Sequence, residues 1–280
     1  MVLPQALQFT TIVLISAVAG AMNAIAGGGT LLTFPALVGL GISPIVANAT
    51  STVALWPGTL SSMWGYRGEL SGARQWAIGF AAPSLLGGGI GAWLLLKTPP
   101  SRFAALVPWL VLSAAGLFMV QPFIMKRIQK HSLPTTAAID PTTTGRPPSF
   151  GVIVLQFLVA IYGGYFGAGV GILMLAVLGF MGLTNIHRMN GLKNWGGCCM
   201  NFVAAVSFSF SSLVRWPIAL GMAIGSIGGG YLGSRLAQRT PQRYVRRAVI
   251  VIGLGGGLWL LFNQRSNETP RNESVTRTDR

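Results

Sequence analysis

The amino-acid sequence predicts an all-α, polytopic membrane protein built from two homologous repeats. Three observations lead to this fold class. Of the 280 residues, 51% are hydrophobic and only 9% are charged, whereas a soluble domain carries about a quarter charged residues. Apolar runs recur along the chain, several of them as long as the roughly 20 residues that cross a bilayer as a helix. The second half of the chain also repeats features of the first half.

Ten apolar segments are predicted to be helices. They cover residues 8–26, 30–41, 45–66, 74–96, 103–120, 150–166, 169–182, 190–213, 216–236 and 244–263. The first lacks the basic stretch and the A-x-A-like cleavage site of a signal peptide, so we expect it to remain in the membrane. Segments 30–41 and 169–182 are short, because about twelve helical residues span only about 18 Å. We expect these two to be half-helices that reach the bilayer midplane.

Polar segments divide the chain into four parts. Residues 121–149 are rich in Pro and Thr and carry several charges, which is typical of a linker outside the membrane. Residues 264–280 are almost entirely polar, which is typical of a disordered tail. We therefore expect transmembrane repeat 1 at 1–120, a cytoplasmic linker at 121–149, transmembrane repeat 2 at 150–263 and a disordered polar tail at 264–280.

The two halves match each other at an offset of about 141 residues. The stretch LLGGGIGAWL at 85–94 aligns with SIGGGYLGSR at 226–235, with the three glycines in register. AGGGTLL at 26–32 likewise aligns with FGAGVGI at 166–172. Internal repeats of this kind are common in membrane transporters, where the binding site lies between the repeats.

The distribution of Lys and Arg favours an inverted relation between the repeats, because cytoplasmic loops are enriched in these residues. With five crossings per repeat, one side of the membrane holds Arg67, Arg74, Lys126, Arg127, Lys130, Arg146, Arg188, Lys193, Arg235, Arg239, Arg243, Arg246 and Arg247, and the other holds Lys97, Arg102 and Arg215. With four crossings the repeats are parallel, and the same residues divide seven against nine. The inverted arrangement places both termini outside and the linker in the cytoplasm.

The net charge of +15 and the two cysteines carry less information. A basic protein can bind nucleic acid. In a membrane protein the same charge faces anionic lipid, so no nucleic-acid partner is expected. Cys198 and Cys199 are adjacent within an apolar run, which gives no support for a disulfide framework.

Glycines interrupt the apolar pattern at equivalent places in the two repeats, at 27–29 and at 167, 169 and 171. A helix broken within the membrane leaves unpaired N–H groups, which are tolerated where the break is buried in protein or lines a watery cavity. The helix that restarts at Thr30 would direct its N–H groups and positive dipole end toward the break, which suits an anion. The alternative is that these glycines only allow close packing of helices. We predict that packing role for Gly221, Gly225, Gly229 and Gly233, which recur every four residues.

Uncharged polar residues and one lysine surround the breaks. Repeat 1 contributes Asn23 and Thr50, and repeat 2 contributes Asn190, Lys193 and Asn194. An ionisable side chain within a membrane segment suggests a functional site. The alternative for Lys193 is that it extends to the lipid headgroups. Asn190 and Asn194 lie one helical turn apart on one face, which suits hydrogen bonding to a single ligand.

Carboxylates are scarce in this sequence. They are Glu69, Asp140, Glu268, Glu273 and Asp279, all in predicted loops, the linker or the tail. Proton-coupled carriers usually depend on carboxylates or histidines within the membrane. The sequence also lacks a His/Glu/Asp metal cluster, H-E-x-x-H, G-x-S-x-G and a P-loop. It therefore predicts an anion site, with no metal, no cofactor and no enzymatic activity.

The stretch GGGTLLTFPALVGLGISPIVANATST at 27–52 resembles the repeat-1 signature of the TauE/SafE sulfite-exporter family. In that family a glycine cluster and a proline precede G-x-x-P and A-x-G-T-S elements, and Ala49 stands here where glycine is usual. In repeat 2 the family's N-x-x-K-N, W-P and GGYLG-R elements correspond to 190–194, 216–217 and 229–235. The resemblance covers about residues 10–263.

The resemblance implies a permease with two homologous halves that moves small sulfur oxyanions or organosulfonates, typically outward across the plasma membrane. Carried onto this chain, it gives the candidate substrate-binding residues Asn23, Gly28, Gly29, Thr50, Asn190, Lys193 and Asn194. The stretch GAGVG at 167–171 departs from the consecutive glycines of the family. The two halves are therefore expected to contribute unequally to the site.

We therefore expect a multi-pass protein of the cell (inner) membrane, whose partners are the lipid bilayer and a small anion such as sulfite or a sulfonate. Two alternatives from other classes are an anion channel and an intramembrane enzyme or assembly factor. The lack of a nucleophile–base pair in the predicted spans counts against the enzyme. The sequence is also compatible with a homodimer.

Overall fold

The computed structural model describes residues 5–71, 73–131, 148–180, 183, 185–237 and 242–273. Within these ranges the regular structure is entirely helical, which confirms the predicted all-α class. The helices are α1 (Gln5–Ala26), α2 (Gly29–Gly39), α3 (Pro44–Gly65), α4 (Arg67–Ser71), α5 (Arg74–Lys97), α6 (Pro100–His131), α7 (Phe150–Tyr165), α8 (Val170–Phe180), α9 (Ile186–Ser209), α10 (Trp216–Ala237) and α11 (Gln242–Glu273).

Each of the ten predicted segments corresponds to one helix, and the short helix α4 is an addition. The helix α6 continues to His131, so it covers the first part of the predicted linker 121–149, whose residues 132–147 lie outside the described ranges. The helix α11 continues to Glu273, although the sequence analysis assigns 264–280 to a disordered tail. A helix already started by an apolar segment extends without a new nucleation step, which explains the greater length. Residues 274–280 lie outside the described ranges.

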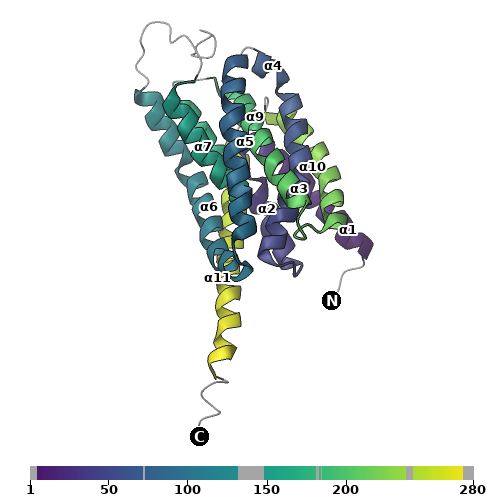
Figure 1. Ribbon diagram of the computed structural model, residues 1–280. Helices are drawn as coiled ribbons and strands as arrows, with labels where there is room; N and C mark the ends of the chain where they lie inside the picture. The colour runs from purple at the N-terminus through teal and green to yellow at the C-terminus, as the bar shows by residue number, and fades with distance from the viewer. Residues whose placement is uncertain are drawn as a thin grey trace.

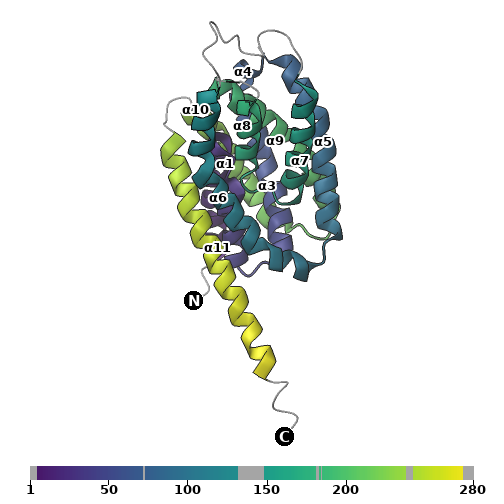
Figure 2. The ribbon, with the colours of Figure 1, turned by 90° about the vertical axis from the view of Figure 1, so that its left-hand side faces the viewer.

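The long helices run roughly along one direction and form an elongated bundle (Figure 1). We call one extremity the α4 end, where Gly65 approaches Ser234 and Gly79 approaches Pro148. We call the other the far end. There Asn48 Nδ2 donates to Tyr165 O over 3.0 Å, the hydroxyl of Tyr165 lies 3.4 Å from Thr98 Oγ1, and Arg215 N donates to Thr50 Oγ1 over 3.1 Å. The helix α1 begins and α11 ends on the far-end side (Figures 1 and 2).

Six helices form two groups of three, and within each group neighbouring helices run parallel. In the first group α1 and α3 both pack on α10, and all three run toward the α4 end. In the second group α7 and α9 both pack on α5, and all three run toward the far end. The two groups meet where α3 packs against α9. Each group therefore combines two helices from one half of the chain with one helix from the other half.

Small residues allow these parallel helices to approach closely. Hydrogen bonds join α3 to α10, because Ser226 Oγ donates to Ala54 O over 2.7 Å and Ser61 Oγ donates to Ile227 O over 2.9 Å. The four glycines predicted to form a packing stripe face α1: a Cβ on any of them would collide with Phe9, Ser16 or the backbone of residues 13, 17 or 21. The predicted packing role of this stripe is confirmed.

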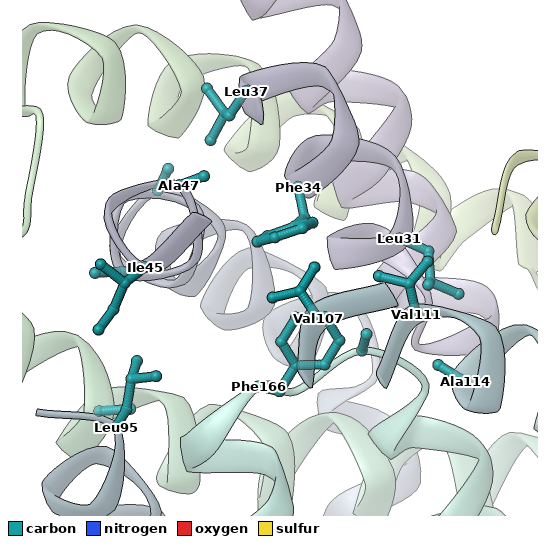
Figure 3. Close-up of a cluster of buried hydrophobic side chains, with 14 of the residues drawn as sticks. Leu31, Phe34, Leu37, Ile45, Ala47, Leu95, Val107, Val111, Ala114 and Phe166 are labelled. Carbon is teal, nitrogen blue, oxygen red and sulfur yellow. The ribbon is translucent and has the colours of Figure 1, made fainter. Parts of the chain in front are cut away.

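The remaining long helices, α6 and α11, pack against each other and enclose the short helices α2 and α8 on one side of the bundle. The largest apolar cluster forms where α2 meets α3, α6 and the start of the α7–α8 connection (Figure 3). At its centre the rings of Phe34 and Phe166 pack edge to face with centroids 5.5 Å apart. The figure labels Leu31, Phe34, Leu37, Ile45, Ala47, Leu95, Val107, Val111, Ala114 and Phe166.

The outer surface is suited to lipid. Within the described residues, three helices are long and apolar enough to cross a bilayer, over Phe9–Ala26, Arg74–Lys97 and Pro100–Phe123, and Gly29–Gly39, Phe150–Tyr165 and Val170–Phe180 are shorter apolar helices. Large apolar side chains are also exposed on other helices, including Ile224 of α10, which is 66% exposed, and Val251 of α11, which is 71% exposed. In water such surfaces would associate, whereas lipid tails solvate them.

We predict that two adjacent glycines of α10 differ sharply in their tolerance of alanine. A Cβ on Gly229 would overlap the backbone of Ala17 in α1, whereas a Cβ on Gly228 meets nothing within 4 Å. Gly229→Ala should cost about 1–3 kcal/mol, as overpacking does. Gly228→Ala should be neutral or stabilising, because alanine favours a helix. Thermal unfolding of both variants in detergent tests this, and equal melting temperatures would contradict the packing described here.

Candidate functional site

The helices α1 and α7 end in the same way, each with a glycine in the left-handed backbone region. Gly27 follows α1 with φ 79°, and its N–H donates to Met22 O over 3.2 Å and Asn23 O over 3.0 Å. Gly167 follows α7 with φ 76°, and its N–H donates to Tyr162 O over 3.2 Å. Glycine adopts this conformation without the steric penalty that a Cβ causes. The two breaks predicted from the sequence are thus real ends of helices.

The two breaks touch each other through backbone atoms. A Cβ on Gly27 would lie 2.5 Å from the Cα of Gly171, and a Cβ on Gly171 would lie 2.7 Å from the Cα of Gly27. Side chains larger than hydrogen are therefore excluded from both positions. This contact brings the C-terminus of α1 next to the N-terminus of α8.

Lys193 of α9 binds the carbonyl groups at the end of α1. Its Nζ donates to Ala24 O over 3.0 Å and to Asn23 O over 3.4 Å, and Asn194 Nδ2 also donates to Ala24 O over 3.3 Å. The last carbonyls of a helix lack partners within the helix, and a cation there is favoured by the helix dipole. Lys193 is only 3% exposed. It therefore does not extend to the headgroups, which was the alternative from the sequence.

A small cavity of about 20 Å³ lies at this crossing. It is lined by Asn23, Gly27, Thr59, Val170, Gly171, Met174, Lys193, Asn194, Gly197 and Asn201. Gly197 is near the midpoint of α9, so the cavity lies near the middle of that helix. A single water needs about 10–15 Å³ by this kind of measure. A four-atom oxyanion needs more room than this cavity provides.

The charges around the cavity favour an anion. The C-terminus of a helix carries roughly −0.5 elementary charge and the N-terminus roughly +0.5. The partial charges at the end of α1 and at the start of α8 therefore nearly cancel. The ammonium of Lys193 then leaves a net charge of about +1. None of the lining residues is acidic. An ammonium also has three N–H donors, and the two carbonyls of α1 accept from only two of them.

Three of the predicted site residues meet at the cavity: Asn23, Lys193 and Asn194. Asn23 comes from the last turn of α1, and its Nδ2 donates to Thr59 Oγ1 of α3 over 3.2 Å. Residues of α1, α3, α8 and α9 therefore surround one small space, and both halves of the chain contribute to it.

The other four predicted residues lie away from the cavity lining. A Cβ on Gly28 would meet Phe118 and Val249, and a Cβ on Gly29 would meet Ala19 O at 2.5 Å, so both glycines lie in tightly packed positions. Thr50 accepts from Arg215 N at the far end. Asn190 is 1% exposed and lies one turn from Asn194, and its Oδ1 has no hydrogen-bond partner among the described residues. The N-terminus at the cavity belongs to α8, and not to α2 as the sequence analysis expects.

Thr59, Met174, Gly197 and Asn201 also line the cavity but were not among the predicted site residues. A periodic signal on α9 indicates two of them. Positions 190, 194, 197 and 201 follow the 4-3-4 spacing of one helix face and carry only Asn or Gly. Thr59 and Met174 have no comparable signal, because packing between the two halves brings them to the cavity. Within the described residues there is also no cluster of three or more His, Cys, Asp or Glu that could hold a metal ion.

Comparisons with known proteins agree with this architecture. A sequence model of the family described as Sulfite exporter TauE/SafE matches residues 12–260. A probable membrane transporter protein, ORF9, of Sinorhizobium sp is 27% identical over 251 residues, covering 87% of this chain and 88% of that protein. Another from Haemophilus influenzae is 27% identical and covers 88% and 92%. The probable membrane transporter protein YfcA of Escherichia coli K12 is 24% identical and covers 91% and 90%. No solved structure matches the chain.

We predict that alanine is tolerated less well at Gly27 than at Gly41. Both have positive φ, 79° and 82°, so both should lose about 1–2 kcal/mol to backbone strain. A Cβ on Gly41 meets nothing within 4 Å, whereas one on Gly27 strikes Gly171. Gly27→Ala should therefore lower the melting temperature in detergent more than Gly41→Ala does. If the two variants melt together, the contact between the breaks is not tight.

Proposed function

Because the chain belongs to the Sulfite exporter TauE/SafE family, we propose that it is a secondary permease that exports small anions, sulfite or an organosulfonate first, across the cell membrane. The observation that carries this proposal is Lys193, a buried cation that lines a cavity between interrupted helices without a carboxylate beside it. A sulfite or sulfonate group presents three oxygen acceptors. The cavity offers donors from Lys193, from the amides of Asn23 and Asn194, and from the start of α8.

Inverted repeats are the second part of the proposal. Exchange of the two halves pairs α1 with α7, α2 with α8, α3 with α9, α5 with α10 and α6 with α11. Under this exchange the contact of α1 with α10 becomes that of α7 with α5, and the contact of α3 with α10 becomes that of α9 with α5. The contact of α2 with α11 likewise becomes that of α8 with α6. This correspondence, with the opposite direction of the two groups of three helices, supports an inverted duplication.

The charges at the two ends support a multi-pass orientation in the inner membrane with the α4 end in the cytoplasm. The cationic residues of the α4 end whose side chains the structure describes are Arg67, Arg74, Arg188, Arg235, Arg246 and Arg247, and those of the far end are Lys97, Arg102 and Arg215. Lys and Arg are enriched on the cytoplasmic side of membrane proteins. In this orientation, transport from the α4 end to the far end is export.

A carrier fits the closed cavity better than an open pore does. In an alternating-access cycle the cavity opens to one side at a time as one group of helices moves against the other. A gradient and a negative interior potential suffice to drive an anion outward, at about 2.3 kcal/mol per charge per 100 mV. We therefore propose uncoupled transport. Sodium coupling would need free oxygen ligands, but the hydroxyls of Thr50 and Ser51 already bond to Arg215 N and to Thr33 Oγ1.

We predict that Lys193→Ala folds but transports poorly. Both carbonyls that Lys193 binds keep another donor, Gly27 N at Asn23 O and Asn194 Nδ2 at Ala24 O. Lys193 is the one cation among the described residues that line the cavity. Its loss should reduce anion flux at least about tenfold, since a charge-assisted hydrogen bond contributes about 1.5–3 kcal/mol. Uptake into proteoliposomes would be measured for sulfite, sulfoacetate, sulfate and chloride. A potassium–valinomycin potential of either sign would be imposed.

The matched control is Lys97→Ala, which removes a lysine at the far end of α5. It should leave uptake within about twofold of wild type, because exposed charges contribute little. Normal flux in folded Lys193→Ala would show that Lys193 does not take part in anion transport. Absence of flux for every anion with folded wild-type protein would overturn the permease. Single-channel currents would identify an anion channel, and turnover of a substrate by detergent-solubilised protein would identify an enzyme.

A further inference from the structure

A second polar hollow, of about 290 Å³, lies at the α4 end. It is lined by Gly65, Tyr66, Arg67, Gly68, Glu69 and Arg235. Its residues come from the end of α3, from α4 and the residue between them, and from the last turn of α10, which belongs to the other half of the chain. With two guanidinium groups and one carboxylate, the hollow has a net positive charge.

Both arginines of the hollow are held in place by aromatic rings. The guanidinium carbon of Arg67 lies 5.0 Å from the ring centroid of Trp64, and that of Arg235 lies 5.5 Å from the ring centroid of Tyr231. Arg67 also donates to Trp64 O over 3.1 Å, and Arg235 to the hydroxyl of Tyr231 over 3.2 Å. Stacking fixes a guanidinium while leaving most of its five donors available. The hydrogen bonds shown for the two arginines therefore do not exhaust their capacity to bind an oxyanion.

Tyr66 connects this hollow to the interior. It lines the hollow, yet only 1% of the residue is exposed, and its hydroxyl has no hydrogen-bond partner among the described residues. Its ring packs with Ile25 of α1 and Ala237 of α10. A buried hydroxyl without a partner is costly, and such a group in a folded protein calls for a reason.

The hollow and the Lys193 cavity lie one above the other along α3. Thr59 lines the cavity and Gly65 lines the hollow, and six residues of helix correspond to about 9 Å. Tyr66 of the hollow packs with Ile25 of α1, and Ile25 directly follows Ala24, whose carbonyl accepts from Lys193. Movement of the end of α1 would therefore alter the Tyr66–Ile25 contact and the Lys193 cavity together.

We propose that this hollow is a capture site for a free oxyanion, from which the anion passes beside the Tyr66 hydroxyl to the Lys193 cavity. The proposal rests on the permease function proposed above. Arg67 and Arg235 concentrate the anion at the α4 end, and the contact between Tyr66 and Ile25 closes the path in the conformation described here. The hydroxyl of Tyr66 gains its missing partner when an oxyanion passes.

The first test is charge removal at the hollow. Sulfite uptake would be measured in inverted membrane vesicles, which present the α4 end to the medium, for Arg67→Gln/Arg235→Gln and for the control Arg74→Gln. Arg74 is exposed at the same end, at the start of α5, and does not line the hollow. The double variant should raise the half-saturating sulfite concentration on the order of tenfold and weaken its dependence on salt, because focused positive charge accelerates association. Arg74→Gln should stay near wild type.

The second test separates the hydroxyl of Tyr66 from its ring. Tyr66→Phe keeps the contact with Ile25 and removes a hydroxyl that has no partner. Its melting temperature should equal or exceed that of wild type, while its maximal sulfite flux should fall several-fold. If Tyr66 has only a structural role, the folded Tyr66→Phe variant should keep the sulfite flux of wild type.

The outcomes distinguish the capture site from the permease. If wild type transports sulfite and the double variant behaves like Arg74→Gln, the arginines contact only headgroups and the capture site is wrong. The capture site is also wrong if the half-saturating sulfite concentrations of the double variant and Arg74→Gln differ in vesicles rich in anionic lipid but agree in zwitterionic proteoliposomes. If folded wild type transports no anion, the permease and the capture site are both overturned. A raised half-saturation in the double variant with reduced flux in Tyr66→Phe supports the proposal.

Discussion

The backbone contact between Gly27 and Gly171 is the constraint on which the rest of the site depends. Helices α1 and α7 must both stop inside the protein, and their following turns must have no side chains where they meet. This contact places the carbonyl end of α1 within reach of Lys193 and brings the start of α8 to the same space. A Cβ at either glycine would push the two halves apart. The polar chemistry of the cavity therefore follows from the absence of two side chains.

The packing of the long helices is consistent with movement of the two groups of three helices against each other. Within each group of three, parallel helices meet through Gly, Ser and Ala, and hydrogen bonds such as Ser226 to Ala54 O tie them together. The two groups are joined in part by side-chain contacts, including Lys193 to the end of α1 at the cavity and Asn48 to Tyr165 O at the far end. Tight packing within groups favours rigid bodies, and few polar links between them favour a change in their relative position.

The sequence was sufficient for the helices but only partly for the site. Length and hydropathy located the ten main helices, and duplicated glycines located both breaks, because these signals are local. Asn23, Lys193 and Asn194 could be predicted because a polar group in an apolar segment is conspicuous. Gly28, Gly29 and Thr50 were assigned to the site from the family resemblance, yet their contacts are with Phe118, Ala19 and Arg215. Packing between the two halves of the chain decides which residues of a break face the cavity. This packing cannot be read from a local stretch of sequence.

On the proposed function, the bonds of Lys193 also explain how its buried charge is stabilised when no anion is bound. A buried charge costs several kcal/mol unless it is paired and hydrogen-bonded. The carbonyls of Asn23 and Ala24 supply that pairing when the cavity holds no anion, because they form the negative end of α1. An oxyanion would use the remaining donor of the ammonium and weaken its hold on α1, since one positive charge would then be shared between two partners. Binding of the anion would thus loosen the end of α1, and its release would restore the carbonyl bonds of the empty carrier.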